Sequence, residues 1–218
     1  MTPLLLVLAA LAGTPTWPEM RTAGWVHEAT RTHAAAGTVE ILSKTVAGTE
    51  CFQGRAKVQL EPEIMFQVAS DIEGAMRWST AGVTDAATLL RTDTIIDYYQ
   101  YLDLPGWTLS ADRFWFLHGH VERAGGAVTF WWERLVDGGP YAAKWQAVKA
   151  AHPSALEPPV NVGAWVFTPV EGGTRVQYMV CSNVGGSIPT SLQNTATTHT
   201  LPDNVGDLVR EATRRSVK

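Results

Sequence analysis

The chain has 218 residues, of which 45% are hydrophobic and 17% are charged, and its formal net charge is −4. This negative balance, without a basic cluster, disfavours nucleic acid as a partner, and nine Trp, five Tyr and six Phe exclude an intrinsically disordered chain. The apolar run at residues 2–12 is shorter than the ~20 residues of a membrane-spanning helix, so a polytopic membrane protein is also excluded.

Residues 1–12 are predicted to form a secretory signal peptide that is cleaved after Ala12. An apolar core at 4–11 leads into Ala10-Leu11-Ala12, an A-x-A cleavage pattern. No Lys or Arg precedes this core, so a buried N-terminal helix or a misplaced start codon is the alternative. The prediction implies a periplasmic or secreted protein.

The remaining chain predicts three strands, a helix, six strands and a long C-terminal helix, in that order. Short alternating runs between Gly, Pro and Asp turns indicate the strands, and apolar residues recur at helical spacing after Pro62. A crossing segment at 137–161 contains one further short helix, at 141–151, and residues 188–215 form the final helix, with Pro202 inside it. The predicted strands are 25–32, 38–46, 51–60, 86–91, 94–102, 112–123, 127–136, 162–170 and 174–183.

No internal repeat or interdomain linker interrupts this order, so a single α+β domain is predicted. One strongly curved antiparallel sheet that grips the long C-terminal helix is the most economical arrangement of these elements.

Two motifs resemble those of the START (StAR-related lipid-transfer) domain. Residues 109–113, Leu-Ser-Ala-Asp-Arg, resemble the serine–x–arginine–aspartate entry to an aromatic strand, with the last two residues inverted. Residues 178–189 are similar to the family's last strand, its Gly-Gly turn and the proline that opens the final helix. The likeness spans residues 22–215 and implies a helix-grip fold, in which about nine strands wrap a long C-terminal helix around an internal cavity.

The resemblance implies a non-catalytic carrier of a lipid, sterol or related hydrophobic molecule. We expect a monomer without a cofactor that contacts membranes transiently. Ligand exchange requires a lid over the cavity, and the long segment 137–161 is the candidate. Tyr178 falls where ceramide-transfer members of the family have a lipid-contacting tyrosine, and Glu133 falls where they have a polar cavity residue. Ser187 replaces the aromatic residue that usually follows the Gly-Gly pair, so that membrane-inserting side chain is missing.

Strand alternation extends these two assignments to neighbouring residues. With Glu133 facing inward, Trp131 also faces inward and Trp132 faces outward, whereas His118 and His120 lie on the convex side; a one-residue bulge would reverse such an assignment. The residues expected to line the cavity or orient the ligand are Glu133, Tyr178, Trp131, Trp115, Val180, Arg113, Leu192, Ala196 and His199.

Glu133 is surrounded by aromatic residues, where a carboxylate needs a cationic partner, hydrogen-bond donors or a proton. It either orients a polar ligand group or forms a structural pair with Arg113 or Arg77 at the sheet rim. The alternative function is an enzyme similar to polyketide aromatase/cyclases or hydrolases, in which Glu133 acts as general acid–base. A structural or interaction domain with a filled core is the third alternative.

The histidines and cysteines give two further expectations. His118 and His120 share one strand face, but no residue at suitable spacing supplies a third ligand, so no metal site is expected. In the START sheet the third strand lies beside the last, so Cys51 and Cys181 are expected to be cross-strand neighbours. They either form a disulfide in an oxidising compartment or are ordinary small core residues.

Overall fold

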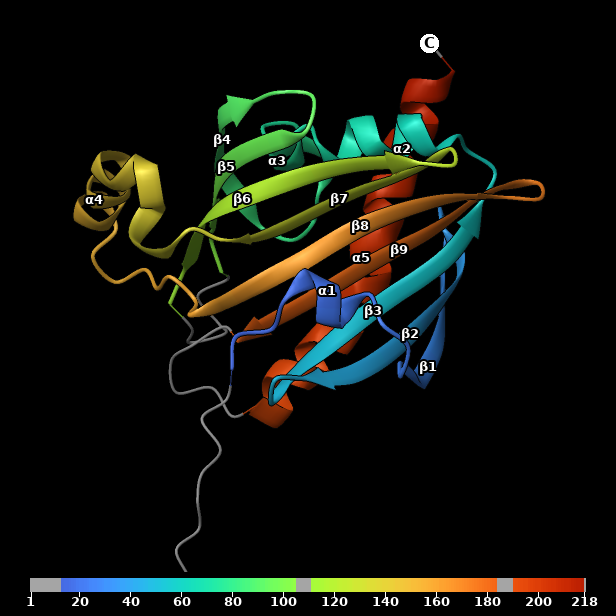
Figure 1. The fold of residues 1–218 in the computed structure, drawn as a ribbon, viewed down its shortest axis with the longest axis horizontal. Helices are drawn as coiled ribbons and strands as arrows, with labels where there is room; N and C mark the ends of the chain where they lie inside the picture. The colour runs from blue at the N-terminus through green and yellow to red at the C-terminus, as the bar shows by residue number, and fades with distance from the viewer. Residues whose placement is uncertain (1–12, 105–110, 184–189, 218) are drawn as a thin grey trace, which may run out of the picture.

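The structure is a computed structural model that describes residues 13–104, 111–183 and 190–217, without the side chains of 183 and 190–197. Nine antiparallel strands form one curved sheet in the order β1-β2-β3-β9-β8-β7-β6-β5-β4 (Figure 1). The predicted number and order of strands are confirmed. The strands are β1 (Val26–His33), β2 (Gly37–Val46), β3 (Thr49–Val58), β4 (Val83–Arg91), β5 (Ile95–Leu102), β6 (Arg113–Ala124), β7 (Ala127–Arg134), β8 (Val160–Val170) and β9 (Gly173–Asn183).

The helices lie on both sides of this sheet. The predicted helix after Pro62 is present as two short helices, and the predicted C-terminal helix runs through Pro202. No helix in the described part of the chain is long and apolar enough to span a membrane. The helices are α1 (Trp17–Met20), α2 (Pro62–Ala69), α3 (Ala75–Trp78), the 3-10 segment η2 (Val136–Tyr141), α4 (Ala142–Ala151) and α5 (Thr190–Ser216).

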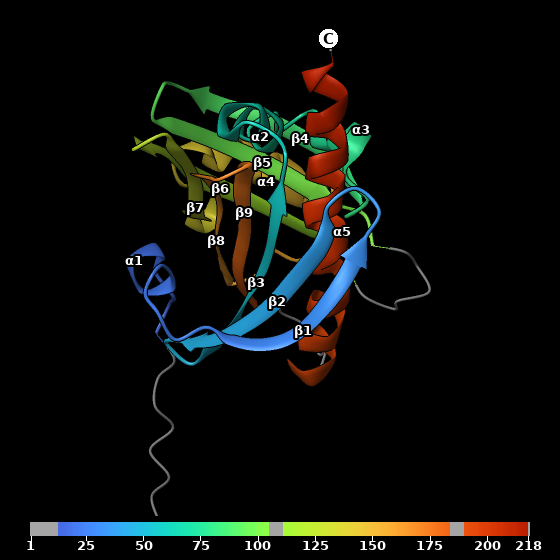
Figure 2. The ribbon, with the colours of Figure 1, turned by 90° about the vertical axis from the view of Figure 1, so that its right-hand side faces the viewer.

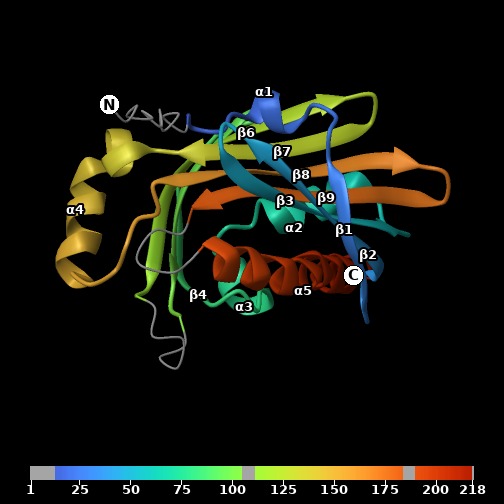
Figure 3. The same ribbon diagram turned by 90° about the horizontal axis from the view of Figure 1, so that it is seen from below.

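The concave, inner face of the sheet holds the main core, against α2 and α5 (Figures 2 and 3). Leu201, Val205, Leu208 and Ala212 of α5 are completely buried, and their spacing of three or four residues places them on one side of the helix. The sheet therefore grips α5 through an apolar stripe, as the helix-grip prediction requires.

Two acidic residues fasten α5 to the segments around α3. The carboxylate of Asp207, which is 1% exposed, accepts hydrogen bonds of 2.6 Å from the backbone and the hydroxyl of Thr80, and pairs with Arg210. Glu211 pairs with Arg215, whose guanidinium also reaches Asp71 at 2.6 Å. These bonds fix the C-terminal half of α5 relative to the sheet.

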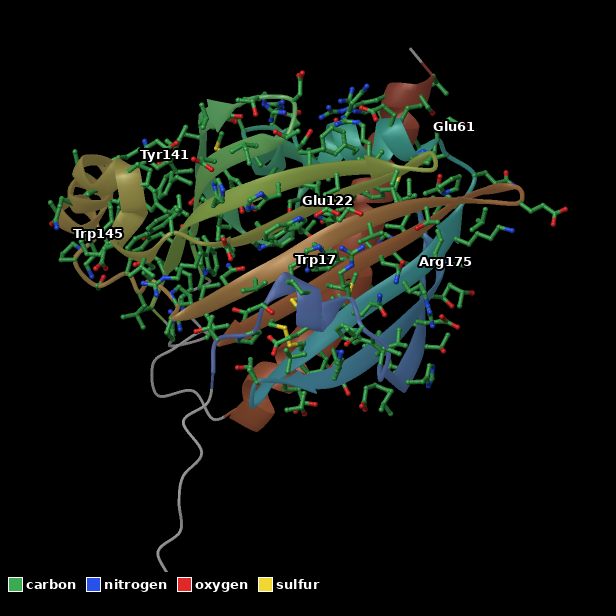
Figure 4. The ribbon with its side chains drawn as sticks, viewed as in Figure 1. Trp17, Glu61, Glu122, Tyr141, Trp145 and Arg175 are labelled. Carbon is green, nitrogen blue, oxygen red and sulfur yellow. A yellow bond between two sulfur atoms is a disulfide. The ribbon has the colours of Figure 1, made fainter. Side chains whose placement is uncertain are left out.

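The convex, outer face carries α1 over the central strands and α4 over β5 and β6. α4 packs on outer-facing aromatic side chains of β5 and β6, including Tyr99 and Phe116. Tyr141, directly before α4, donates a hydrogen bond to Asp97, and Trp145 of α4 donates one to Glu157 (Figure 4). Because these contacts hold segment 137–161 on the outer face, the prediction that it forms a lid over the inner face is wrong.

Cys51 and Cys181 form a disulfide between β3 and β9. They are directly opposite each other in the antiparallel register, with their Cα atoms 4.2 Å apart, and both are completely buried. Trp17 and Met20 of α1 belong to the same outer-face cluster. The disulfide thus joins two central strands beneath the N-terminal segment.

Candidate functional site

The inner face of the sheet is lined by aromatic side chains, and the alternation of β7 differs from the prediction. Phe130 and Trp132 pack in the inner core, whereas Trp131 packs on the outer face against Trp17, with ring centroids 6.3 Å apart. Glu133 is exposed and pairs in register with Val162 on the outer face. The placement of Glu133 and Trp131 in the cavity is therefore wrong by one residue, and Trp132 is the inner residue.

The register of β7 follows from two glycines on the neighbouring strands. Trp132 lies opposite Gly119 of β6 and Gly163 of β8. A Cβ atom at Gly163 would lie 2.4 Å from the Trp132 ring, and one at Gly119 would lie 2.7 Å from the Phe130 ring. The aromatic rings thus occupy the space that these glycines leave on the inner face.

Glu133 has no ion pair among the described residues, and both predicted partners contact other groups. The guanidinium of Arg113 donates to the carbonyl oxygens of Ala111 and Asp112, and Arg77 lies 3.9 Å from Asp71. Burial lowers the pKa of Arg113, which is 3% exposed, while the charge of Asp112 acts in the opposite direction. Arg113 begins the inner row of β6, so its predicted side of the sheet agrees with the structure.

Tyr178, Trp115 and Val180 lie on the inner face, as predicted. The Tyr178 ring is 4.3 Å from the Trp165 ring and 6.2 Å from the Trp132 ring, measured between centroids. Trp115 belongs to the inner core, and Val180 pairs in register with Phe52, which packs against Leu201 of α5. These side chains form an aromatic wall that faces the helix.

Three polar groups on this wall make no hydrogen bond to any other described residue. They are the hydroxyls of Tyr98 and Tyr178 and the indole nitrogen of Trp115, which is buried. In contrast, the indole nitrogen of Trp132 donates to Asn161 at 3.0 Å. A buried donor is normally satisfied, so the Trp115 indole nitrogen marks a place where another molecule can bind, and the two hydroxyls on the same wall can donate to such a molecule.

The two tyrosines remain protonated at neutral pH. Burial raises the pKa of Tyr178 to about 12, and burial together with the nearby Tyr178 raises the pKa of Tyr98 well above its usual range. Both hydroxyls can therefore donate a hydrogen bond to an oxygen atom of a ligand. Tyr178 is only half-buried although it lies on the inner face, which leaves part of its surface accessible.

The predicted site also includes three residues of α5, namely Leu192, Ala196 and His199. His199 is exposed, so its predicted position against the sheet is wrong. At 100° per residue, His199 lies about 200° around the helix from the buried Leu201, which puts it on the opposite side. The side chains of Leu192 and Ala196 lie outside the described residues, so their predicted contacts are not tested.

The outer face carries a cluster of His and acidic residues. His118 Nδ1 lies 2.5 Å from an oxygen of Asp97, and its ring centroid is 4.3 Å from that of His120. His120 stacks on Trp131 at 3.8 Å, and burial is the largest cause that lowers its pKa. No group of three His, Cys, Asp or Glu residues with metal-binding geometry is present in residues 13–104, 111–182 and 198–217.

Sequence reasoning placed Trp132 on the wrong face and did not select Tyr98 or Trp165 as site residues, although the mid-strand positions of both tryptophans indicated burial or cavity lining. Tyr98 stands in a run of tyrosines that offers hydroxyls to both faces, so composition does not select it. The signal for Trp132 and Trp165 is Gly163, a mid-strand glycine that lies opposite Trp132 and two residues before Trp165. A glycine inside a strand indicates a close approach by another group.

No protein-family model matches the chain, and no curated protein matches it. Among solved structures, a STAR-related lipid transfer protein from Xanthomonas axonopodis superposes with a TM-score of 0.69 at 22% identity, covering 88% of this chain and 99% of that one. Human STARD10 gives 0.71 at 14% identity, covering 90% and 76%. The Zhui aromatase/cyclase from Streptomyces gives 0.54 at 9% identity, covering 76% and 94%. These likenesses confirm that the chain has the START-like, helix-grip fold.

Proposed function

We propose that the protein binds a hydrophobic small molecule between the inner face of its sheet and α5, and carries it without chemical change. The ligand has a largely apolar body and at least one oxygen acceptor. Lipids, sterols and related molecules have this chemistry, and two of the similar structures are described as lipid transfer proteins.

The observation that supports this proposal is the set of three donors without described partners on an aromatic wall. A ligand site needs apolar walls for affinity and a few polar groups for orientation. Trp115, Trp165 and Tyr178 supply the first, and the Tyr98 hydroxyl, the Tyr178 hydroxyl and the Trp115 indole nitrogen supply the second.

The enzyme alternative loses its expected acid–base residue. A general acid must lie within hydrogen-bond reach of the reacting group. Glu133 is exposed on the outer face, with the sheet between its side chain and α5. A similar structure is nevertheless an aromatase/cyclase, so the fold by itself fits both classes.

The test compares a conservative double variant on the inner face, in β5 and β9, with a conservative single variant on the outer face of β5. Tyr98→Phe/Tyr178→Phe removes both inner hydroxyls, whereas Tyr99→Phe removes an outer one. Binding of NBD-labelled cholesterol and NBD-labelled phosphatidylcholine is followed by fluorescence, and native mass spectrometry of the purified protein detects ligand acquired in the host. We expect saturable binding of a probe that weakens about tenfold in the double variant and is unchanged in Tyr99→Phe. Absence of probe binding and of any co-purified ligand would contradict the proposal.

We further propose that the protein is exported and acts as a monomer that contacts membranes transiently. The cleavage pattern after Ala12 supports export, and so does the Cys51–Cys181 disulfide, because disulfides persist in oxidising compartments. N-terminal sequencing of protein from a periplasmic or culture fraction is the test. A mature protein that begins at Met1, or is found in the cytoplasm, contradicts export.

A further inference from the structure

A second candidate site lies on the outer face, away from α5. A depression of about 480 Å³ lies between the outer face of β2, β3, β7, β8 and β9 and the N-terminal strap, defined as residues 17–25. Small-molecule sites commonly measure about 300–1,000 Å³. The depression is therefore large enough for a small ligand.

The floor of the depression is formed by two cross-strand rows of side chains. Leu42, Gln53 and Met179 are paired in register in one row, and Arg55, Gln177, Val166 and Thr129 are paired in the other. The floor therefore combines two amides and one hydroxyl with apolar side chains.

Gln53 is the residue that points to a ligand. It is 2% exposed, lines the depression and makes no hydrogen bond to any other described residue. Its amide group can offer two donors and one acceptor to a molecule in the depression. Gln177 and Thr129 also line the depression and have no hydrogen bond to a described residue. A bound molecule can satisfy all three.

The charged residues at the rim are already paired. Arg55 donates to Glu40 at 2.8 Å, and Arg21 lies 3.8 Å from Glu122. Figure 4 shows Glu122 and the strap residue Trp17 on the same face of the sheet. Neither guanidinium group offers an uncompensated charge, so the depression favours a neutral ligand over an anion.

The strap that walls the depression is held in place. Lys44 donates to the carbonyl oxygens of Glu19 and Thr22, at 2.8 and 3.3 Å, and to the Thr22 hydroxyl at 2.6 Å. The indole nitrogen of Trp25 donates to the carbonyl oxygen of Met20 at 3.1 Å. These bonds fix an indole ring in the wall, and a preorganised wall lowers the entropic cost of binding.

We propose that this depression binds a neutral sugar ring. The C–H face of a pyranose is apolar and packs on an indole, whereas its hydroxyls need donors and acceptors around the rim. Trp25 supplies the indole, and the amides of Gln53 and Gln177 with the Thr129 hydroxyl supply the polar groups. The site is on the opposite face of the sheet from the proposed lipid site and does not depend on it.

The test uses three methyl glycosides as probes: methyl glucoside, methyl galactoside and methyl mannoside. Binding is measured on the full chain by calorimetry and by the shift of the Gln53 side-chain amide signal, which is identified by its loss in Gln53→Met. Glycerol, which has hydroxyls but no ring, is the control probe. We expect saturable binding of at least one glycoside and no saturable binding of glycerol.

The variants separate recognition from folding. Gln53→Met keeps the volume of the side chain and removes its hydrogen bonds, so we expect binding to weaken at least about tenfold without a loss of folding. Gln59→Met, at an exposed position just beyond β3, should bind as the wild type does. Should Gln53→Met fail to fold, Gln177→Met takes its place with the same expectation. No saturable binding of any glycoside, equal binding of glycerol, or wild-type affinity in the folded variant would overturn the proposal.

Discussion

Trp132 of β7 lies against Gly163 of β8, so closely that a Cβ atom at residue 163 would be 2.4 Å from the indole ring. The same Cβ atom would lie 2.7 Å from the carbonyl oxygen of Met179. The contact fixes which residues of β7 face α5, and with them the composition of the inner wall.

Gly163→Ala is expected to destabilise the protein by about 3 kcal/mol, because the added methyl group meets both a ring and a backbone oxygen that cannot easily move. Gly54→Ala is the matched control: its nearest neighbour is a methyl group of Val205 at 3.1 Å, so a loss below about 1 kcal/mol is expected. Urea unfolding of both variants measures the difference. Equal stability of the two would show that Trp132 is not fixed against residue 163.

Glu133→Gln and Trp132→Ala test the two faces of β7. Glu133 is exposed, so Glu133→Gln should change the free energy of unfolding by no more than about 0.5 kcal/mol and leave probe binding at the inner face unchanged. Trp132→Ala removes a buried ring and should cost about 3–5 kcal/mol. A large effect of Glu133→Gln on binding of the NBD probes would mean that Glu133 does reach the inner site.

The Cys51–Cys181 disulfide is expected to contribute about 2–5 kcal/mol to stability, because it restricts the unfolded chain across a sequence separation of 130 residues. Replacing both cysteines by alanine should lower the urea midpoint accordingly. Since both residues are completely buried, a reductant should act only when the protein unfolds. Alkylation of either thiol in the native, oxidised protein would contradict the bond.

Alkaline pH should destabilise the protein through Tyr178. Its pKa is about 12 in the folded state and about 10 in the unfolded chain, so above pH 10 the unfolded state loses a proton that the folded state keeps. The corresponding stability is complete below pH 10 and falls by about 2 kcal/mol as the pH approaches 12. Tyr178→Phe should make the unfolding free energy less dependent on pH in this range. An unchanged pH dependence would contradict the raised pKa.

Acidic pH should destabilise the protein through Glu211. Hydrogen bonds from Arg214 and Arg215 lower its pKa to about 2, against the opposing effect of burial. Its stabilisation is present above about pH 4.5 and is lost as the pH falls toward 2. Glu211→Gln should therefore cost about 2 kcal/mol at pH 7 and less at pH 3. Glu171→Gln, on an exposed turn, is the control and should have no effect at either pH.

The order of elements was readable from the sequence because each strand and helix has its own local pattern. Turn residues separate the strands, and helical spacing after Pro62 and in the C-terminal segment marks the helices. The resemblance to START domains then placed Cys51 beside Cys181, since it supplied the pairing of the third strand with the last. These features depend on local periodicity and on chain order, both of which a single sequence contains.

The face of each β7 side chain was decided only by the tertiary structure. Residues 129–133 carry large aromatic side chains at both alternating positions, so no polar–apolar pattern distinguishes the faces. Trp131 is compatible with the outer face because Trp17 and His120 cover it, and Trp132 fits the inner face because Gly119 and Gly163 leave space. Both conditions involve residues that are distant in sequence. The side of α5 that faces the sheet was also decided by the tertiary structure. Leu201 and Val205 pack against the sheet, and this packing leaves His199 exposed. The sequence did not predict this, because the row of apolar residues is interrupted between residues 199 and 205 and does not define a single face of the helix.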